Sequence, residues 1–215
     1  VRSDIVAIGA ETYIAPDDSD AINLLIFGGS QGARIFSDVI PASIAAMPAS
    51  LRRRVRIVQQ ARPEDMDRVQ AAYAEADQQA EIASFFDDMP DRMRDAHLVI
   101  ARSGASTVAE LAAAGRPAIL IPYAAALDDH QTANAAALVA AGGAWLLPEA
   151  NMTAEAMAAL ITKVLGAPKG LQSAATAARS AARADAAEAL ADVIEAAALQ
   201  SSRSAASQTL GGIAA

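Results

Sequence analysis

Short, nearly continuous apolar segments recur at even intervals along the chain, and each is followed by a segment whose apolar residues repeat with the period of a helix. Strands that are apolar on both sides are typical of sheets buried between two layers of helices. The predicted strands span residues 22–27, 55–59, 81–86, 97–101, 118–123 and 144–147. The predicted helices span residues 32–47, 63–76, 89–95, 105–114, 129–141 and 153–165.

Strands that alternate with helices indicate βαβ units, which form a parallel sheet with right-handed crossovers. We therefore predict an α/β fold with a Rossmann-like, doubly wound parallel six-stranded sheet in the strand order 3-2-1-4-5-6. Ligands bind to such sheets at the carboxyl ends of the strands, near the point where the strand order reverses. The loops that follow the strands are thus the candidate binding segments.

The chain divides into four segments. Residues 1–20 are expected to be a hinge or linker, and residues 21–166 to form the sheet domain. After a glycine-containing break at 166–170, an alanine-rich run predicts a C-terminal helix within residues 167–200. Residues 201–215 are expected to be a disordered tail.

Charge and cysteine content exclude several classes of protein. The 215 residues carry 17 Lys and Arg against 25 Asp and Glu, a net charge of −8, and show no basic cluster typical of nucleic-acid binding. The chain has no cysteine, which excludes disulfides and fits a cytosolic protein, and its two histidines lie far apart. We expect no metal, cofactor or nucleic acid. No apolar run approaches the about 20 residues that span a bilayer. Because the chain starts at Val1, we expect it to be part of a longer protein.

The loop after the first strand contains Gly28, Gly29, Ser30, Gln31 and Gly32 and leads directly into a helix. Glycines let a ligand approach the main chain, and the N-terminus of the helix offers free N–H groups to a phosphate. The loop has neither the ending of a Walker A motif nor the G-x-G-x-x-G pattern of dinucleotide sites. A tight turn without a ligand is the alternative interpretation.

The loop after the fourth strand starts at Arg102 and runs to Glu110 through small residues that leave room for a ligand. The first and fourth strands flank the expected switch point, so these two loops are predicted to lie across one crevice. Glu110 could accept hydrogen bonds from the two hydroxyls of a ribose. Alternatively, Thr107 and Glu110 have the spacing of a capping box.

Two further loops place candidate groups at the same edge. After the fifth strand, His130, Gln131 and Asn134 could hydrogen-bond a sugar, or the segment could serve only to cap a helix through Asp128 or Asp129. After the third strand, Phe85 and Phe86 are either core residues or the walls of a slot for a base.

The sequence contains no convincing catalytic group. It has no G-x-S-x-G elbow and no evident Ser-His-Asp or Cys-His arrangement. His97 opens a strand and is expected to be structural. We therefore predict binding residues but no catalytic residue in this chain.

Together, these loops resemble one family, the MurG glycosyltransferases of peptidoglycan synthesis. The resemblance covers residues 1 to about 195, and several motifs in family-like order and spacing are more specific than any one of them. The motifs occupy residues 27–34, 86–89, 102–110, 114–123 and 129–134, and residues 1–4 resemble the family's interdomain hinge.

The resemblance implies a GT-B architecture of two Rossmann-like domains, with this chain as the carboxyl-terminal, donor-binding half. It implies inverting, metal-free transfer of N-acetylglucosamine from UDP-N-acetylglucosamine to undecaprenyl-pyrophosphoryl-N-acetylmuramyl-pentapeptide. This step converts lipid I to lipid II in cell-wall biogenesis, on which cell shape and cell division depend. The acceptor site, the general base and the membrane contact are implied to lie in the other half. The enzyme would then be peripheral on the cytoplasmic side of the bacterial inner membrane, and this chain alone inactive.

The resemblance also implies roles for individual residues. Ser30 and the backbone of 28–32 would hold the diphosphate with Arg2 near it, the main chain of Phe86 would read uracil, and Glu110 would hold the ribose. Sugar and phosphate contacts are implied for Ala105, Ser106 and Gln131. The family often has Gln-Gln where this chain has His130-Gln131, which puts the contact at His130 in doubt.

Three alternatives stay open. One is another UDP-sugar enzyme of the GT-B fold, such as an epimerase or a glycolipid glycosyltransferase. Another is a non-catalytic nucleotide-binding domain. A dinucleotide oxidoreductase is the third, although the missing G-x-G-x-x-G pattern disfavours it.

Overall fold

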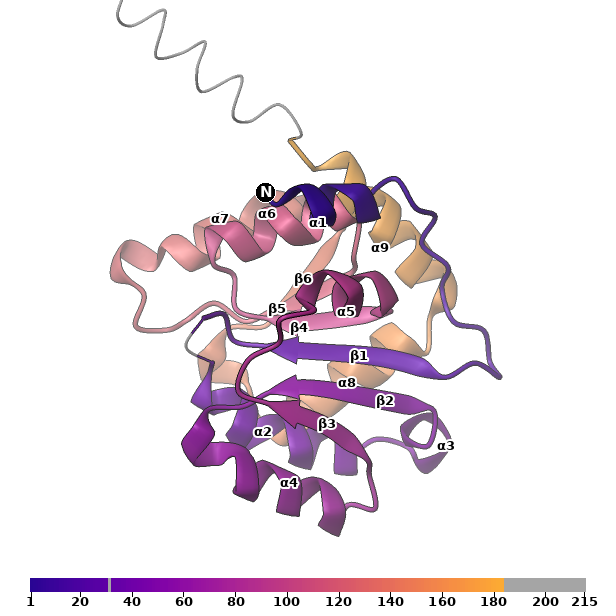
Figure 1. Cartoon of the computed structure of the whole chain (residues 1–215), viewed down its shortest axis with the longest axis vertical. Helices are drawn as coiled ribbons and strands as arrows, with labels where there is room; N and C mark the ends of the chain where they lie inside the picture. The colour runs from indigo at the N-terminus through magenta and orange to yellow at the C-terminus, as the bar shows by residue number, and fades with distance from the viewer. Residues whose placement is uncertain (31, 184–215) are drawn as a thin grey trace, which may run out of the picture. The chain divides into compact units, whose positions relative to one another are not determined.

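Six strands form one parallel sheet in the order β3-β2-β1-β4-β5-β6, which confirms the predicted fold class and strand order (Figure 1). The structure is a computed structural model, and it describes residues 1–30 and 32–183. Because every neighbouring pair of strands is parallel, all carboxyl ends lie at one edge of the sheet. The strands are β1 (Ile22–Phe27), β2 (Val55–Gln60), β3 (Ala80–Ala83), β4 (Leu98–Ala101), β5 (Ala118–Leu120) and β6 (Ala144–Leu146).

Helices connect the strands. The α-helices of the described residues are α1 (Ser3–Ile8), α2 (Arg34–Ala45), α3 (Ala49–Arg52), α4 (Met66–Glu75), α5 (Met89–Asp95), α6 (Ala105–Ala114), α7 (His130–Ala140), α8 (Ala154–Leu165) and α9 (Pro168–Ser180). Short 3₁₀ helices occur at η1 (Pro63–Asp65), η2 (Leu127–Asp129) and η3 (Glu149–Asn151).

The core has two layers, because alternate residues of a strand point to opposite faces of the sheet. In β1, Leu24 and Ile26 are buried in one apolar cluster, whereas Leu25 and Phe27 belong to a second cluster on the other face. Figure 1 shows α2, α4 and α8 on one side of the sheet and α1, α5, α6 and α7 on the other. Helix α9 contributes residues to both clusters, so it packs on this domain.

Residues 1–20 contain a helix that the sequence pattern did not predict. Helix α1 packs against α6, and its Ile5 and Ile8 are fully buried. A helix of six residues is shorter than the window from which a helical period can be read. Helix α1 is thus an addition to the predicted elements, while the hinge or linker role of residues 1–20 stays a prediction.

Two predicted strands end earlier than expected. Strand β3 stops at Ala83, opposite Gln60 at the end of β2, and β5 stops at Leu120, opposite Ala101 at the end of β4. A strand loses its ladder where its neighbour ends, although Ile121 beyond β5 is still fully buried. The apolar residues therefore indicate which positions are buried, and not where the hydrogen-bonded strands end.

The end of the chain also departs from the prediction. Helix α9 begins at Pro168, inside the predicted break at 166–170, and proline is well suited to the first turn of a helix. Residues 184–215, which include the rest of the predicted C-terminal helix and the predicted tail, lie outside the described residues. Within residues 1–30 and 32–183, no helix is long and apolar enough to cross a membrane.

Candidate functional site

The loops after β1 and β4 lie side by side at the carboxyl edge of the sheet. Phe27, the last residue of β1, pairs with Ala101, the last residue of β4. The strand order reverses between these two strands. The structure therefore brings the two principal candidate loops to the switch point, as predicted from the sequence.

Gln60, the last residue of β2, fixes the start of the glycine loop that follows β1. The N–H of Gly28 donates to Oε1 of Gln60 (3.0 Å), and Nε2 of Gln60 donates to the carbonyl of Ser84 (3.1 Å). A Cβ on Gly28 would lie 2.3 Å from the backbone nitrogen of Ala33, so no larger residue fits. Gly32 has a φ of +67°, a conformation that glycine adopts without strain. The two ends of the loop, Gly28 and Gly32, are thus constrained, and Gln60, which binds Gly28, was missed in the sequence.

The start of α2 is open to a ligand. Its N-cap, Ala33, has an extended backbone and provides no side-chain cap for the first-turn N–H groups. Ser30 is exposed beside it, while Gln31 lies outside the described residues. Free N–H groups and the positive end of the helix dipole suit an anion at this position.

The second loop leads into α6, which starts at Ala105 without a side-chain cap. Ala105 and Ser106 are exposed in the first turn. Since Gly104 is the N-cap, Glu110 lies in the second turn, and the capping-box interpretation was wrong. Like the start of α2, the start of α6 offers uncapped N–H groups at this edge.

Glu110 is held by Arg2. The Nε of Arg2 lies 2.9 Å from Oε1 of Glu110, and its terminal nitrogen donates to Oε2 (3.1 Å). The hydrogen bond to Glu110 raises the pKa of Arg2, against the effect of partial burial. The structure therefore joins the residue expected near the diphosphate to the residue expected to hold the ribose.

The loop after β5 is joined to the start of α7 and, through α7, to the loop after β4. Oε1 of Gln131 accepts from the N–H of Tyr123 (3.0 Å), and Nδ2 of Asn134 donates to the carbonyl of Ser103 (3.1 Å). His130 is exposed at the first position of α7. Asp129 is the N-cap, but its carboxylate accepts from a threonine hydroxyl rather than from a first-turn N–H, so side-chain capping by Asp129 was wrong. This loop is positioned by Gln131 and Asn134.

The two phenylalanines after β3 differ in environment. Phe86 is buried, and the guanidinium of Arg92 lies 4.2 Å from the centre of its ring. Arg92 also pairs with Glu81 (2.6 Å) and Asp88 (2.7 Å). The core interpretation therefore applies to the Phe86 ring, whereas Phe85 is 64% exposed.

A buried ion pair behind the site was not predicted from the sequence. Arg102, only 8% exposed, binds Glu149 through both terminal nitrogens (3.0 and 3.1 Å) and donates to the carbonyls of Ile121 and Pro122. Glu149 also accepts from the N–H of Ala124 (2.8 Å). Burial raises the pKa of Glu149, but the hydrogen bonds from Arg102 and Ala124 outweigh burial and lower it. An arginine directly after a buried strand was the available signal for this pair.

No metal site is evident. In the part of the chain that the structure describes, no three His, Asp or Glu side chains gather as metal ligands would. Nδ1 of His97 accepts from the N–H of Asn23 (2.9 Å), which fits the structural role expected for His97.

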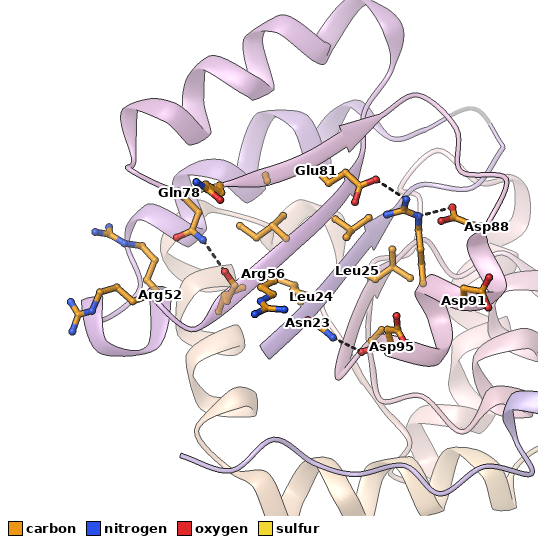
Figure 2. Close-up of a pocket in the computed structure, with 18 of the residues that line it drawn as sticks. Asn23, Leu24, Leu25, Arg52, Arg56, Gln78, Glu81, Asp88, Asp91 and Asp95 are labelled. Carbon is orange, nitrogen blue, oxygen red and sulfur yellow. Dashed lines mark hydrogen bonds and ion pairs between the residues drawn. The ribbon is translucent and has the colours of Figure 1, made fainter. Parts of the chain in front are cut away.

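A hollow of the described domain lies away from the candidate loops, along the open face of β1, β2 and β3 (Figure 2). It measures about 960 Å³ and exists because α5, with seven residues, is too short to cover this face. Figure 2 shows charged side chains across it, among them Arg52, Arg56, Glu81 and Asp88. Arg92 pairs with both Glu81 and Asp88. We interpret this groove as a solvated sheet face, since its Arg92 is already paired with Glu81 and Asp88.

The fold and the site define a Rossmann-like α/β domain with two uncapped helix N-termini facing its switch point. Residues 23–190 match the family model of the glycosyltransferase family 28 C-terminal domain, and the chain belongs to this family. The resemblance to MurG proteins is thereby confirmed, and the dinucleotide oxidoreductase alternative is not supported.

Curated relatives carry the name UDP-N-acetylglucosamine--N-acetylmuramyl-(pentapeptide) pyrophosphoryl-undecaprenol N-acetylglucosamine transferase. The relative from Rhodospirillum centenum is 49% identical over 205 residues, which cover 95% of this chain and 54% of the relative. The relative from Paramagnetospirillum magneticum is 52% identical over 180 residues, which cover 84% and 48%. The chain thus spans about half the length of the curated relatives it matches.

Solved structures of glycosyltransferases and related enzymes are also similar to this chain. MurG of Acinetobacter baumannii matches with a TM-score of 0.73 and 31% identity, over 89% of this chain and 52% of that protein. The UDP-GlcNAc 2-epimerase of Neisseria meningitidis matches with a TM-score of 0.56 at 13% identity, over 82% and 44%, and this likeness shows the fold alone.

Proposed function

We propose that this chain is the donor-binding half of an inverting N-acetylglucosaminyltransferase that uses UDP-N-acetylglucosamine. The observation that carries the proposal is the meeting of two uncapped helix N-termini at the β1–β4 switch point, in a chain of glycosyltransferase family 28. The names of the curated relatives support this donor.

The diphosphate of the donor binds the glycine loop and the start of α2. Gly28, Gly29 and Gly32 expose the backbone there, Ser30 adds a hydroxyl donor, and Gln31 belongs to the same loop. During transfer, UDP leaves as an anion, and preorganised N–H groups stabilise the charge that develops. This electrostatic stabilisation takes the place of a divalent metal.

The nucleoside and the sugar bind beside the diphosphate. Glu110 accepts hydrogen bonds from the ribose, and Arg2, which pairs with Glu110, lies near the diphosphate; the pairing of these two residues supports adjacent ribose and phosphate subsites. The main chain of Phe86 reads uracil. The first turn of α6, at Ala105 and Ser106, contacts the sugar and phosphate together with Gln131 and His130.

The acceptor is the lipid-linked N-acetylmuramyl-pentapeptide of peptidoglycan synthesis, as the names of the relatives suggest. The acceptor site, the general base and the membrane contact lie in a further domain of the full-length protein. The enzyme is then peripheral on the cytoplasmic side of the inner membrane, and it contributes to cell-wall biogenesis, cell shape and cell division.

Calorimetric titration with UDP-N-acetylglucosamine tests the proposal. We expect saturable binding that is weakened by both Ser30→Ala and Glu110→Ala. Ser50→Ala and Glu75→Ala, at exposed positions of α3 and α4, serve as matched controls and should bind like the parent chain. Absence of binding at millimolar donor would contradict the proposed function.

A further inference from the structure

The end of β2 contributes a second residue to the glycine loop besides Gln60. The backbone of Arg62 is extended (φ −63°, ψ 151°), and its side chain packs against Gly32. A Cβ on Gly32 would lie 3.2 Å from Cγ of Arg62 and 3.7 Å from its backbone nitrogen. Gln60 and Arg62 thus support the two ends of the loop, at Gly28 and Gly32.

Among the described residues, the guanidinium of Arg62 has no assigned partner. Its Nε is buried and has no hydrogen-bond partner, and no carboxylate pairs with this side chain among the described residues. A buried donor without an acceptor is costly, and more so when it is charged. In a chain with a net charge of −8, a cation left beside an open loop calls for an anionic partner.

A candidate partner within the protein is Asp65, one turn further along the chain. Oδ2 of Asp65 is also buried without a partner, but its Oδ1 already binds Arg68 (2.7 Å). Arg68 in turn pairs with Asp38 (2.8 Å). Because Arg68 already neutralises the carboxylate of Asp65, that residue does not require the charge of Arg62.

We propose that Arg62 is a further donor-binding residue, whose guanidinium donates hydrogen bonds to the diphosphate held by the glycine loop. The proposal rests on the function proposed above. The planar fork of arginine matches two oxygens of a phosphate, which a neutral residue cannot reproduce. Arg62 would therefore select nucleotides that carry phosphates over the bare nucleoside.

The test compares UDP with uridine, which lacks the diphosphate, in calorimetric titrations of the whole chain. Arg62→Gln is expected to weaken UDP binding about tenfold, or about 1.4 kcal/mol, and to change uridine binding by less than about twofold, or about 0.4 kcal/mol. Arg62→Lys keeps the charge and should retain part of the affinity. Arg53→Gln, at an exposed arginine between α3 and the start of β2, removes the same charge away from the loop and should leave both affinities unchanged.

The outcomes separate this inference from the proposed function. The inference is wrong, and the proposed function stands, if the parent chain binds UDP and Arg62→Gln binds UDP equally well. The same holds if Arg62→Gln lowers the affinities for UDP and for uridine by the same factor. If Arg62→Gln lowers the midpoint of thermal unfolding and the additional change Asp65→Asn restores it, the role of Arg62 is to pair with Asp65, and the inference is wrong. If the parent chain binds no uridine nucleotide, both proposals are overturned.

Discussion

At the residue scale, the ion pair of Arg102 and Glu149 holds the loop after β5 against the end of β4. Its side chains are only 10% and 21% exposed, and removing one partner from a buried pair leaves an uncompensated charge. We expect Glu149→Gln to lower the free energy of unfolding by about 2–4 kcal/mol, measured by urea denaturation. Glu75→Gln on the exposed surface of α4 is the control, and an equal effect of both changes would show that the pair has no structural role.

His97 predicts a pH dependence of stability. Burial lowers its pKa from 6.5, with Arg116 acting in the same direction and Asp20 and Asp95 opposing. The folded state thus binds fewer protons than the unfolded chain, so stability is present above pH 6.5 and declines as the pH falls below it. Unfolding free energies measured from pH 8 to pH 5 should show this decline in the parent chain and in His130→Gln, but a smaller one in His97→Gln. If stability declines as much in His97→Gln as in the parent chain, other titrating groups cause the decline.

Single residues were predictable only where sequence neighbours define them. Gly28 and Ser30 lie between a strand and a helix that the pattern located, and Glu110 lies at a fixed distance from the end of β4. The pairing of Arg2 with Glu110 joins residues 108 positions apart and depends on the packing of α1 against α6. No local pattern carries such a contact.

At the element scale, the turn from β1 into α2 is the most constrained part of the site. We expect Gly28→Ala to destabilise the domain by about 1–3 kcal/mol, as other overpacked sites do, because the added Cβ would lie 2.3 Å from the nitrogen of Ala33. It should also abolish UDP binding, because α2 must shift. Gly170→Ala, within α9, is the control and should stabilise by about 0.5–1 kcal/mol. Equal stability of the two variants in urea would contradict the geometry of the turn.

The elements themselves were predictable to different degrees. Long periodic helices such as α6 matched at both ends, because their buried faces repeat over several turns. Helix α1 is too short for such a period, and β3 and β5 end where their neighbours end, which only the sheet itself determines. The sequence pattern thus predicted the central elements, but not the elements whose ends are determined by neighbouring strands or helices.

At the scale of the whole molecule, the strand order was predictable because right-handed crossovers leave few arrangements for six βα units. The same order places the candidate loops at one edge, and a helix N-terminus faces that edge after both β1 and β4. The domain is therefore suited to binding an anionic donor. The chemistry of transfer also needs an acceptor and a base that accepts its proton.

We therefore predict that residues 1–215 bind UDP-N-acetylglucosamine but transfer no sugar to a lipid-linked acceptor. The chain spans about half the length of its curated relatives, so the acceptor half is expected in the remainder of such proteins. A radiolabelled transfer assay should show no product from the chain alone, and product once the amino-terminal half of a relative is joined to it. Glu110→Ala in the joined protein should reduce that product. Turnover by the chain alone would contradict this prediction, because it would show that the chain itself contains a base.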